Sequence, residues 1–272
     1  DAMGPYEVLN PRKIWWMVVL IVSISLAAYV AQKLIGPRAG SVLGGILGGL
    51  ISSTATTVSY ARQTKSNPDA SSTAALVILI ASTIVNGRVL FEIGVVSPNL
   101  LGIAAPPILI MLGWMTVLCM VAFLLSGRHA TENPLDDNPA QLTAAIVFAA
   151  LYAVILLAVA AVKTNFGQEA LYALAVISGL TDVDAITLST AQMFNDERLD
   201  PGTAWRVILI ATLANLAFKG VAAALLGNRR LCFYLIPLFG LSLAGGILLL
   251  LFWPEWEIDV QPLLDSFRSP EG

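Results

Sequence analysis

The sequence predicts an all-α polytopic membrane protein with about eight transmembrane segments, built as two tandem four-segment repeats in which the second segment of each repeat is interrupted. Composition gives the first reason: the 272 residues are 57% hydrophobic and 12% charged, whereas a soluble protein carries roughly a quarter charged residues. Apolar segments of membrane-spanning length give the second reason. The third is a gap-free match between the two halves of the chain.

The apolar segments divide the chain into two membrane regions. A hydrocarbon core about 30 Å thick needs about 20 apolar helical residues to cross it. The stretches that meet or approach this length are 14–31, 39–62, 73–96, 100–126, 142–162, 168–193, 203–226 and 231–253. The longest polar connection is "SGRHATENPLDDNPAQ" at 126–141. The expected units are a first membrane repeat at 9–127, a polar linker at 128–140, a second membrane repeat at 141–254 and a C-terminal tail at 255–272.

Single residues mark the ends of these segments. Trp15 and Trp16 begin the first segment and Trp253 ends the last, where indole side chains favour the membrane–water interface. Pro106 and Pro107 predict a kink or a late start in the fourth segment. The Lys and Arg residues divide eight against seven between the two sides of an eight-span arrangement, so the positive-inside rule does not give the orientation.

A constant offset of 130 residues relates the two halves. Under it, "TAALVILIA" at 73–81 matches "TAWRVILIA" at 203–211 in seven of nine positions. The matched small and polar residues include Gly49 with Gly179, Ala55 with Ala185, Thr57 with Thr187 and Ser59 with Ser189. A match that carries polar positions indicates an internal duplication, as in many transporters. Both second segments are long enough to cross completely, so parallel repeats are expected; re-entrant second segments would leave three crossings in each half and invert the repeats.

Polar residues gather in the middle of the second segment of each half, in "GGLISSTATTVSYARQ" and "SGLTDVDAITLSTAQM". Polar groups that face hydrocarbon are costly, so these residues should face protein or a water-filled cavity. Asp182 and Asp184 point about 200° apart on a regular helix, but on an unwound stretch they can converge with freed carbonyls. The candidate ion- or substrate-binding residues are Ser52, Ser53, Thr54, Thr56, Thr57, Asp182, Asp184 and Thr187.

Oxygen ligands of this kind suit hard cations such as Mg²⁺ or Na⁺. We therefore expect Asp182 and Asp184 to bind a metal ion as substrate, with no resident cofactor, and a proton could use the same carboxylates. The hydroxyl groups have an alternative role, because Ser and Thr in membrane helices often bond back to their own backbone.

Candidate charge partners lie in the third segment of each half. They are Arg88 and Lys219, with Asn86 and Asn215 just before them. Arg88 and Glu92 are one helical turn apart and should form an i,i+4 pair. The two cations would compensate the aspartates when no cation is bound. Two alternatives stay open: the cations snorkel to an interface, or they attract an anionic substrate.

Other classes of function have little support. The glycines near residue 48 do not form a nucleotide-binding motif, and no basic run indicates nucleic-acid binding. His129 is the single histidine, which argues against a zinc or copper site and against a Ser–His–Asp arrangement. We therefore do not expect an enzyme.

Three motifs carry a family resemblance: "LNPRKIW" at 9–15, "GGLISSTATTVSYAR" at 48–62 and "SGLTDVDAITLS" at 178–189. Through them the chain resembles the C-terminal membrane domain of unknown function found in MgtC/SapB-type bacterial membrane proteins. The resemblance implies a bacterial inner (plasma) membrane location, an association with magnesium or other metal homeostasis, and an MgtC-like membrane domain as a partner. It implies no established activity.

These observations favour a membrane transporter or channel for a small ion, with a cation expected and a site at the midplane between the two repeats. The alternative is a non-transporting scaffold or regulatory module that associates through glycine-rich helix faces. Gly40, Gly44 and Gly48 form overlapping GxxxG patterns, which favour close helix packing and lead us to expect a homodimer in the lipid bilayer.

Overall fold

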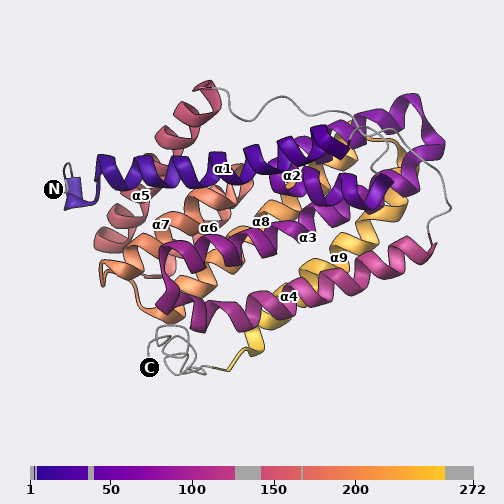
Figure 1. Ribbon diagram of the computed structural model, residues 1–272. Helices are drawn as coiled ribbons and strands as arrows, with labels where there is room; N and C mark the ends of the chain where they lie inside the picture. The colour runs from indigo at the N-terminus through magenta and orange to yellow at the C-terminus, as the bar shows by residue number, and fades with distance from the viewer. Residues whose placement is uncertain (1–2, 4, 36–39, 126–141, 167, 255–272) are drawn as a thin grey trace, which may run out of the picture.

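The computed structural model describes residues 3, 5–35, 40–125, 142–166 and 168–254, which are helical almost throughout (Figure 1). The expected linker at 128–140 and the tail at 255–272 lie outside these residues. The α-helices are α1 (Pro11–Ile35), α2 (Gly40–Ser66), α3 (Ser71–Val96), α4 (Pro98–Leu125), α5 (Leu142–Phe166), α6 (Gln168–Thr181), α7 (Val183–Asn195), α8 (Pro201–Leu226) and α9 (Arg229–Phe252). Short 3₁₀ helices occupy Pro5–Glu7 and Pro68–Ala70.

The described helices confirm a multi-pass membrane protein. Seven of them, α2 included, are long and apolar enough to cross a membrane when length and composition alone are considered, which leaves aside how α2 is folded. The eighth expected segment, 168–193, is divided between α6 and α7, which have 14 and 13 residues. The fourth segment does not start late, since Pro106 and Pro107 lie inside α4.

α2 is a helical hairpin, because it reverses direction at Ser52. The backbone of Ser52 is extended (φ −164°, ψ 102°) in an otherwise helical stretch. A Cβ atom on Gly48 would lie 2.5 Å from Thr56 Oγ1, although residues eight apart in a straight helix are separated by about 12 Å. We call the two arms the 40–51 arm and the 53–66 arm.

Packing against α3 confirms the reversal of α2. The 40–51 arm runs parallel to α3, since Gly45 lies against Ile80 and Gly49 lies against Ala81. The 53–66 arm ends next to the start of α3, to which only a short 3₁₀ turn connects it. This arm therefore runs antiparallel to α3, and both ends of α2 lie at the same end of the bundle.

α6 and α7 form a second helical hairpin. Asp182 between them is extended (φ −155°, ψ 126°). α7 ends close to the end of α5, where Lys163 Nζ donates a hydrogen bond to the carbonyl oxygen of Arg198. Only residue 167 separates α5 from α6. α6 therefore starts at the end of the bundle at which α7 finishes.

The two hairpins enter the bundle from opposite ends. Asn195, the last residue of α7, donates to the carbonyl oxygen of Val96 at 2.7 Å, which places the end of α7 beside the end of α3. α2 instead opens beside the start of α3. The expectation that segments 39–62 and 168–193 cross completely is therefore wrong. A single extended residue in the middle of each segment turns the chain back.

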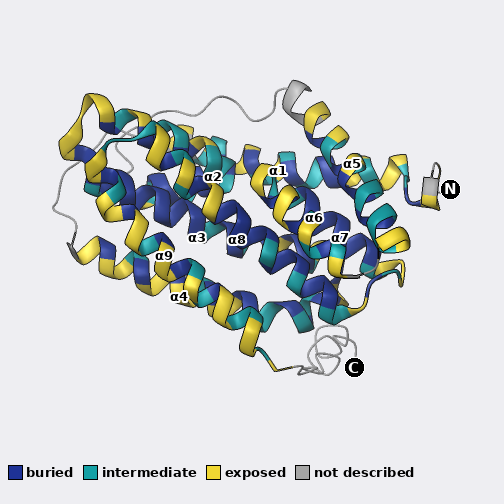
Figure 2. Ribbon diagram, turned by 180° about the vertical axis from the view of Figure 1, so that it is seen from behind, coloured by how far each residue is buried: buried dark blue, intermediate teal, exposed yellow. Residues whose placement is uncertain are grey.

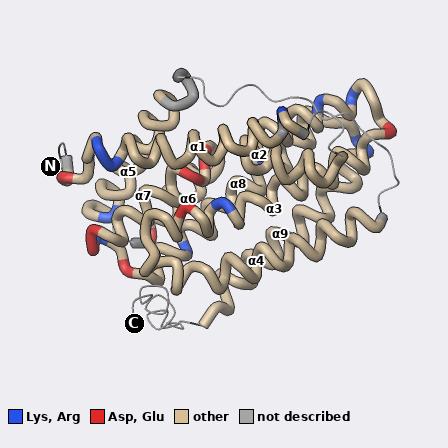
Figure 3. Tube along the Cα trace, in the orientation of Figure 1, with Lys and Arg blue, Asp and Glu red and all other residues tan. Residues whose placement is uncertain are grey.

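α3 and α8 form the centre of the bundle, and both are buried along much of their length (Figure 2). α3 packs against α2, α4, α7 and α9, and α8 packs against α2, α4, α6, α7 and α9. Most charged residues lie near the two ends of the long helices, but a small group of acidic and basic residues lies at mid-length (Figure 3). The candidate site is built around this group.

Candidate functional site

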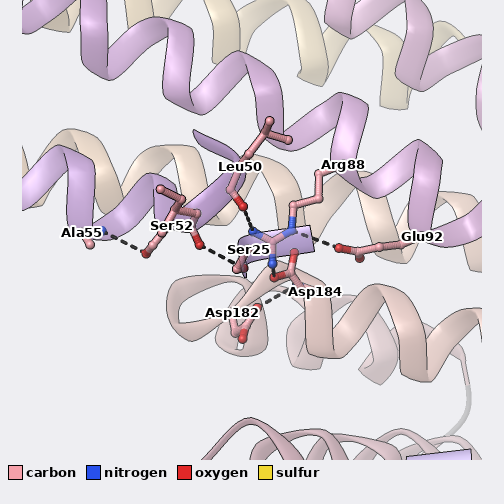
Figure 4. Close-up of polar contacts among 9 residues, drawn as sticks. Ser25, Leu50, Ser52, Ala55, Arg88, Glu92, Asp182 and Asp184 are labelled. Carbon is pink, nitrogen blue, oxygen red and sulfur yellow. Dashed lines mark hydrogen bonds and ion pairs between the residues drawn. The ribbon is translucent and has the colours of Figure 1, made fainter. Parts of the chain in front are cut away.

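Arg88 connects the turns of the two hairpins (Figure 4). One terminal nitrogen donates to the carbonyl oxygen of Leu50 at 3.1 Å, just before the turn of α2. The other pairs with the carboxylate of Asp184, just after the turn between α6 and α7. Nε donates to Glu92 Oε1 at 3.2 Å, so the expected i,i+4 pair is present. A single guanidinium on α3 thus holds both turns.

The breaks in the two hairpins explain why backbone carbonyl oxygens belong to the candidate site. The last carbonyls of a helix have no intrahelical donor. At the turn of α2, the carbonyl of Leu50 is satisfied by Arg88, and that of Ile51 accepts from Ser25 Oγ of α1 at 3.3 Å. At the second turn, Asn215 Nδ2 of α8 donates to the carbonyl of Gly179 at 2.9 Å. A side chain of the third segment therefore caps the first arm in each half.

Two residues 130 positions apart, Ser52 and Asp182, start the second arms of the hairpins. Ser52 Oγ accepts from the backbone nitrogen of Ala55 at 3.2 Å, and Asp182 Oδ1 accepts from that of Asp184 at 2.7 Å. Both are N-cap interactions. The positive end of each helix dipole therefore points at the turn region, where it favours the carboxylates of Asp182 and Asp184. Asp182 has a structural role as an N-cap beside any role in binding.

Burial is highest on the α3 and α8 side of the group of charged residues around Arg88. The side chains of Arg88 and Glu92 are 7% and 0% exposed, and Lys219 is 2% exposed. Asp184 is 14% exposed, Asp182 is half-buried and Thr181 is exposed. The turn of the second hairpin is thus the more accessible part. Because charges in such surroundings interact strongly, the balance between carboxylates and cations governs what the site can hold.

Two polar groups of the cluster lack partners among the described residues. Glu92 Oε2 is buried and accepts no hydrogen bond. No hydrogen bond or ion pair joins Lys219 to a described residue. Of the two expected cations, Arg88 pairs directly with Asp184, and a role for Lys219 stays a prediction.

The predicted hydroxyl residues have different environments. Thr56 Oγ1 and Thr57 Oγ1 each donate at 2.8 Å to a carbonyl four residues earlier, those of Ser52 and Ser53, so they bond back to their own helix. Ser53 and Thr54 are half-buried at the turn. Thr187 lies one turn after Asp184 on α7, and its buried Oγ1 has no partner among the described residues.

Asn86 does not join the cluster. Its Nδ2 donates to the carbonyl of Thr83 at 3.3 Å and to Met115 Sδ of α4 at 3.5 Å. Ser25 and the carbonyl of Leu50 do contribute, although neither is among the site residues predicted from the sequence. Ser25 carries no motif, and a backbone oxygen gives no sequence signal at all. Within the part of the chain that the structure describes, no three His, Cys, Asp or Glu side chains are arranged to hold a metal ion.

Comparison with known sequences places this architecture in a family. Residues 19–227 match the model of a family described as a domain of unknown function, DUF4010. The chain belongs to this family. The DUF4010 match contains both hairpins and the whole charged group around Arg88. An uncharacterized protein from Aquifex aeolicus (strain VF5) is 31% identical over 150 residues, which cover 53% of this chain and 65% of that protein. No solved structure matches the chain.

The DUF4010 match also limits the expected resemblance. It agrees with a membrane domain of unknown function, but neither the family match nor the Aquifex protein links the chain to MgtC/SapB-type proteins. Neither the description of the DUF4010 family nor the name of the Aquifex protein states an activity, so function has to be argued from the site.

Proposed function

We propose that the protein is a transporter or channel for a small cation, with the ion-binding site where the turns of the two hairpins meet around Arg88. One observation carries the proposal: two polar helical hairpins enter from opposite ends of the bundle, and Arg88 bridges Leu50 in one turn and Asp184 after the other. Interrupted helices with freed carbonyls near mid-depth are typical of ion sites in transporters.

An inverted internal duplication, which we infer from positions 130 residues apart, would support this function. The extended residues Ser52 and Asp182 are 130 positions apart, and α3 and α8 begin and end 130 positions apart. Gly49 approaches the backbone of Ala81 as Gly179 approaches that of Ala211, at the same interval. Because the hairpins open at opposite ends, the two halves would have opposite orientations in the membrane. Inverted repeats let one central site open alternately to either side.

The position of the guanidinium suggests how a cation would bind. Arg88 is a positive charge held by three oxygens: the carbonyl of Leu50 and the carboxylates of Asp184 and Glu92. A cation that binds Asp182, Asp184 and the turn carbonyls would compete with Arg88 for Asp184. Losing that ion pair would separate the two turns from each other, so binding would be coupled to movement of the hairpins. This coupling by charge competition distinguishes a transport site from a static ion pair.

The glycine contacts favour transport over the scaffold alternative. Gly45, Gly48 and Gly49 pack against Ile80, Thr56 and Ala81 inside the chain. These glycines permit the tight hairpin and its approach to α3, so they do not form a face available to a partner. The homodimer, the MgtC-like partner and the bacterial inner membrane stay predictions.

Asp182→Asn tests the proposal with the least structural damage. Asn caps a helix as well as Asp does, so the variant keeps the turn and removes one negative charge. We expect cation uptake into proteoliposomes to fall at least tenfold, with unchanged thermal unfolding. Asp200→Asn is the matched control, because Asp200 is the N-cap of α8 and accepts from the backbone nitrogen of Thr203 at 2.8 Å. Equal uptake by both variants would contradict the proposal.

A further inference from the structure

We propose that the site binds one monovalent cation at a time and discriminates against divalent cations. The inference rests on the proposed transport function and specifies its class of substrate. It concerns the charged cluster, which is defined as Arg88, Glu92, Asp182, Asp184 and Lys219.

The charged cluster has a formal charge of −1. It contains three carboxylates and two cations, so with every group ionised one negative charge has no counter-charge within the cluster. Arg88, Glu92 and Lys219 are buried, with Glu92 0% exposed, and Asp182 and Asp184 are half-buried. In surroundings of low dielectric constant an excess charge is costly. One added positive charge would make the cluster neutral, whereas a divalent ion would leave it with one excess positive charge.

The hydrogen bonding of the cluster leads to the same conclusion. Glu92 Oε2 is buried without a donor among the described residues, so the negative charge is not fully satisfied by the protein. Lys219 adds a buried positive charge that no described residue pairs with directly. Its field repels any bound cation, and it repels a divalent ion twice as strongly as a monovalent ion at the same place. Arg88, held between Leu50, Asp184 and Glu92, shows that this place stabilises a singly charged group.

The available ligands also differ from those of a divalent site. Ca²⁺ takes six to eight oxygens with several carboxylates, and Mg²⁺ demands a near-ideal octahedron. The described residues offer no group of three acidic side chains in such an arrangement. Asp182 is half-buried at the turn, and Asp184 becomes a ligand only when the cation displaces Arg88 from it. At most two carboxylates with turn carbonyls are then available, a ligand set that suits Na⁺ at an interrupted helix.

The test compares Li⁺, Na⁺ and K⁺ with Mg²⁺, Ca²⁺ and Mn²⁺ in proteoliposomes of the full chain, with an interior pH dye to follow protons. We expect at least one monovalent ion, an alkali-metal ion or the proton, to move at least tenfold faster than any divalent ion. Faster divalent movement would overturn this inference and leave the transport function intact. Absence of any cation movement would overturn both.

Two variants shift the charge of the cluster in opposite directions. Lys219→Met leaves two uncompensated negative charges, so the ratio of divalent to monovalent uptake should rise at least tenfold. Glu92→Gln leaves the cluster without an uncompensated negative charge, so monovalent uptake should fall at least tenfold. Lys65→Met, at the exposed end of α2, is the control and should match the unmodified protein. An unchanged ratio in folded Lys219→Met, or full uptake by Glu92→Gln, contradicts the inference. If one variant fails to fold, the other and the ion panel still decide.

Discussion

Replacing Arg88 by Met should destabilise the protein strongly, because the guanidinium is the only described group that joins the two hairpin turns to each other. The substitution keeps much of the side-chain volume and removes three contacts: the hydrogen bond to Leu50, the ion pair with Asp184 and the ion pair with Glu92. Two buried carboxylates then lose their partner. Removing one member of a buried ion pair costs about 3–5 kcal/mol.

The expected change is large enough for a thermal assay. A loss of 1 kcal/mol lowers the midpoint by about 2–4 °C in a protein of a few hundred residues, so we expect a decrease of roughly 10 °C. Tryptophan fluorescence of the detergent-solubilised protein would follow unfolding. Arg62→Met removes an exposed arginine from α2 and should leave the midpoint within about 2 °C, since surface substitutions usually change stability by less than 0.5 kcal/mol.

A triple variant separates charge from packing. Combining Arg88→Met with Asp184→Asn and Glu92→Gln removes the stranded charges, and replacing a whole buried ion group by neutral residues is often neutral for stability. The triple variant should therefore regain most of the decrease in unfolding midpoint that Arg88→Met causes. If Arg88→Met alone is as stable as the unmodified protein, or if the triple variant is less stable than Arg88→Met, the reasoning about the cluster is refuted.

Three further predictions test the fold around the site. Gly179→Ala should lower the free energy of unfolding by about 1–3 kcal/mol through overpacking, because the added Cβ would lie 2.8 Å from Ala211 Cα. Gly113 has open space around it, so Gly113→Ala should leave the unfolding midpoint unchanged or raise it. Cysteines placed at Ser41 and at Lys65 should react with an impermeant thiol reagent from the same side of the membrane, and labelling from opposite sides would disprove the α2 hairpin. Burial acts to raise the pKa of Asp200, but hydrogen bonds from Thr203 outweigh this effect and lower the pKa. The carboxylate therefore stabilises the fold at pH values above its unfolded-state pKa of about 3.9, and this stabilisation should disappear as the pH falls through the lower folded-state pKa. Asp200→Asn should flatten the acid side of the curve of stability against pH.

Local patterns in the sequence account for much of the fold. Hydrophobic length located the helices, and the sequence match at an offset of 130 residues pointed to the two polar tracts that contain Ser52 and Asp182. The Arg88–Glu92 pair was also predictable, since its spacing on one helix fixes the contact. Such features depend on residues within a turn or two of each other.

The reversal of the two tracts was not predictable in the same way. A single extended residue in a long helical pattern is compatible with a kink or with a full turn back. The contacts that decide it are distant in sequence, such as Gly49 with Ala81 and Gly48 with Thr56. The different roles of Asn86 and Asn215 depend on how α3 and α8 are rotated, which packing sets and local sequence does not. Arg88 donates to the backbone carbonyl oxygen of Leu50, and a contact with a backbone atom cannot be predicted from residue type.

Diffraction from crystals grown with Rb⁺ is the measurement that tests the central claim most directly, because the anomalous signal of Rb⁺ locates a monovalent cation without ambiguity. The account predicts an anomalous peak between the two hairpin turns, in contact with Asp182, and a longer separation between Arg88 and Asp184 than in crystals without Rb⁺. An intact Arg88–Asp184 pair with no peak at the turns, at Rb⁺ concentrations that support uptake, would contradict it.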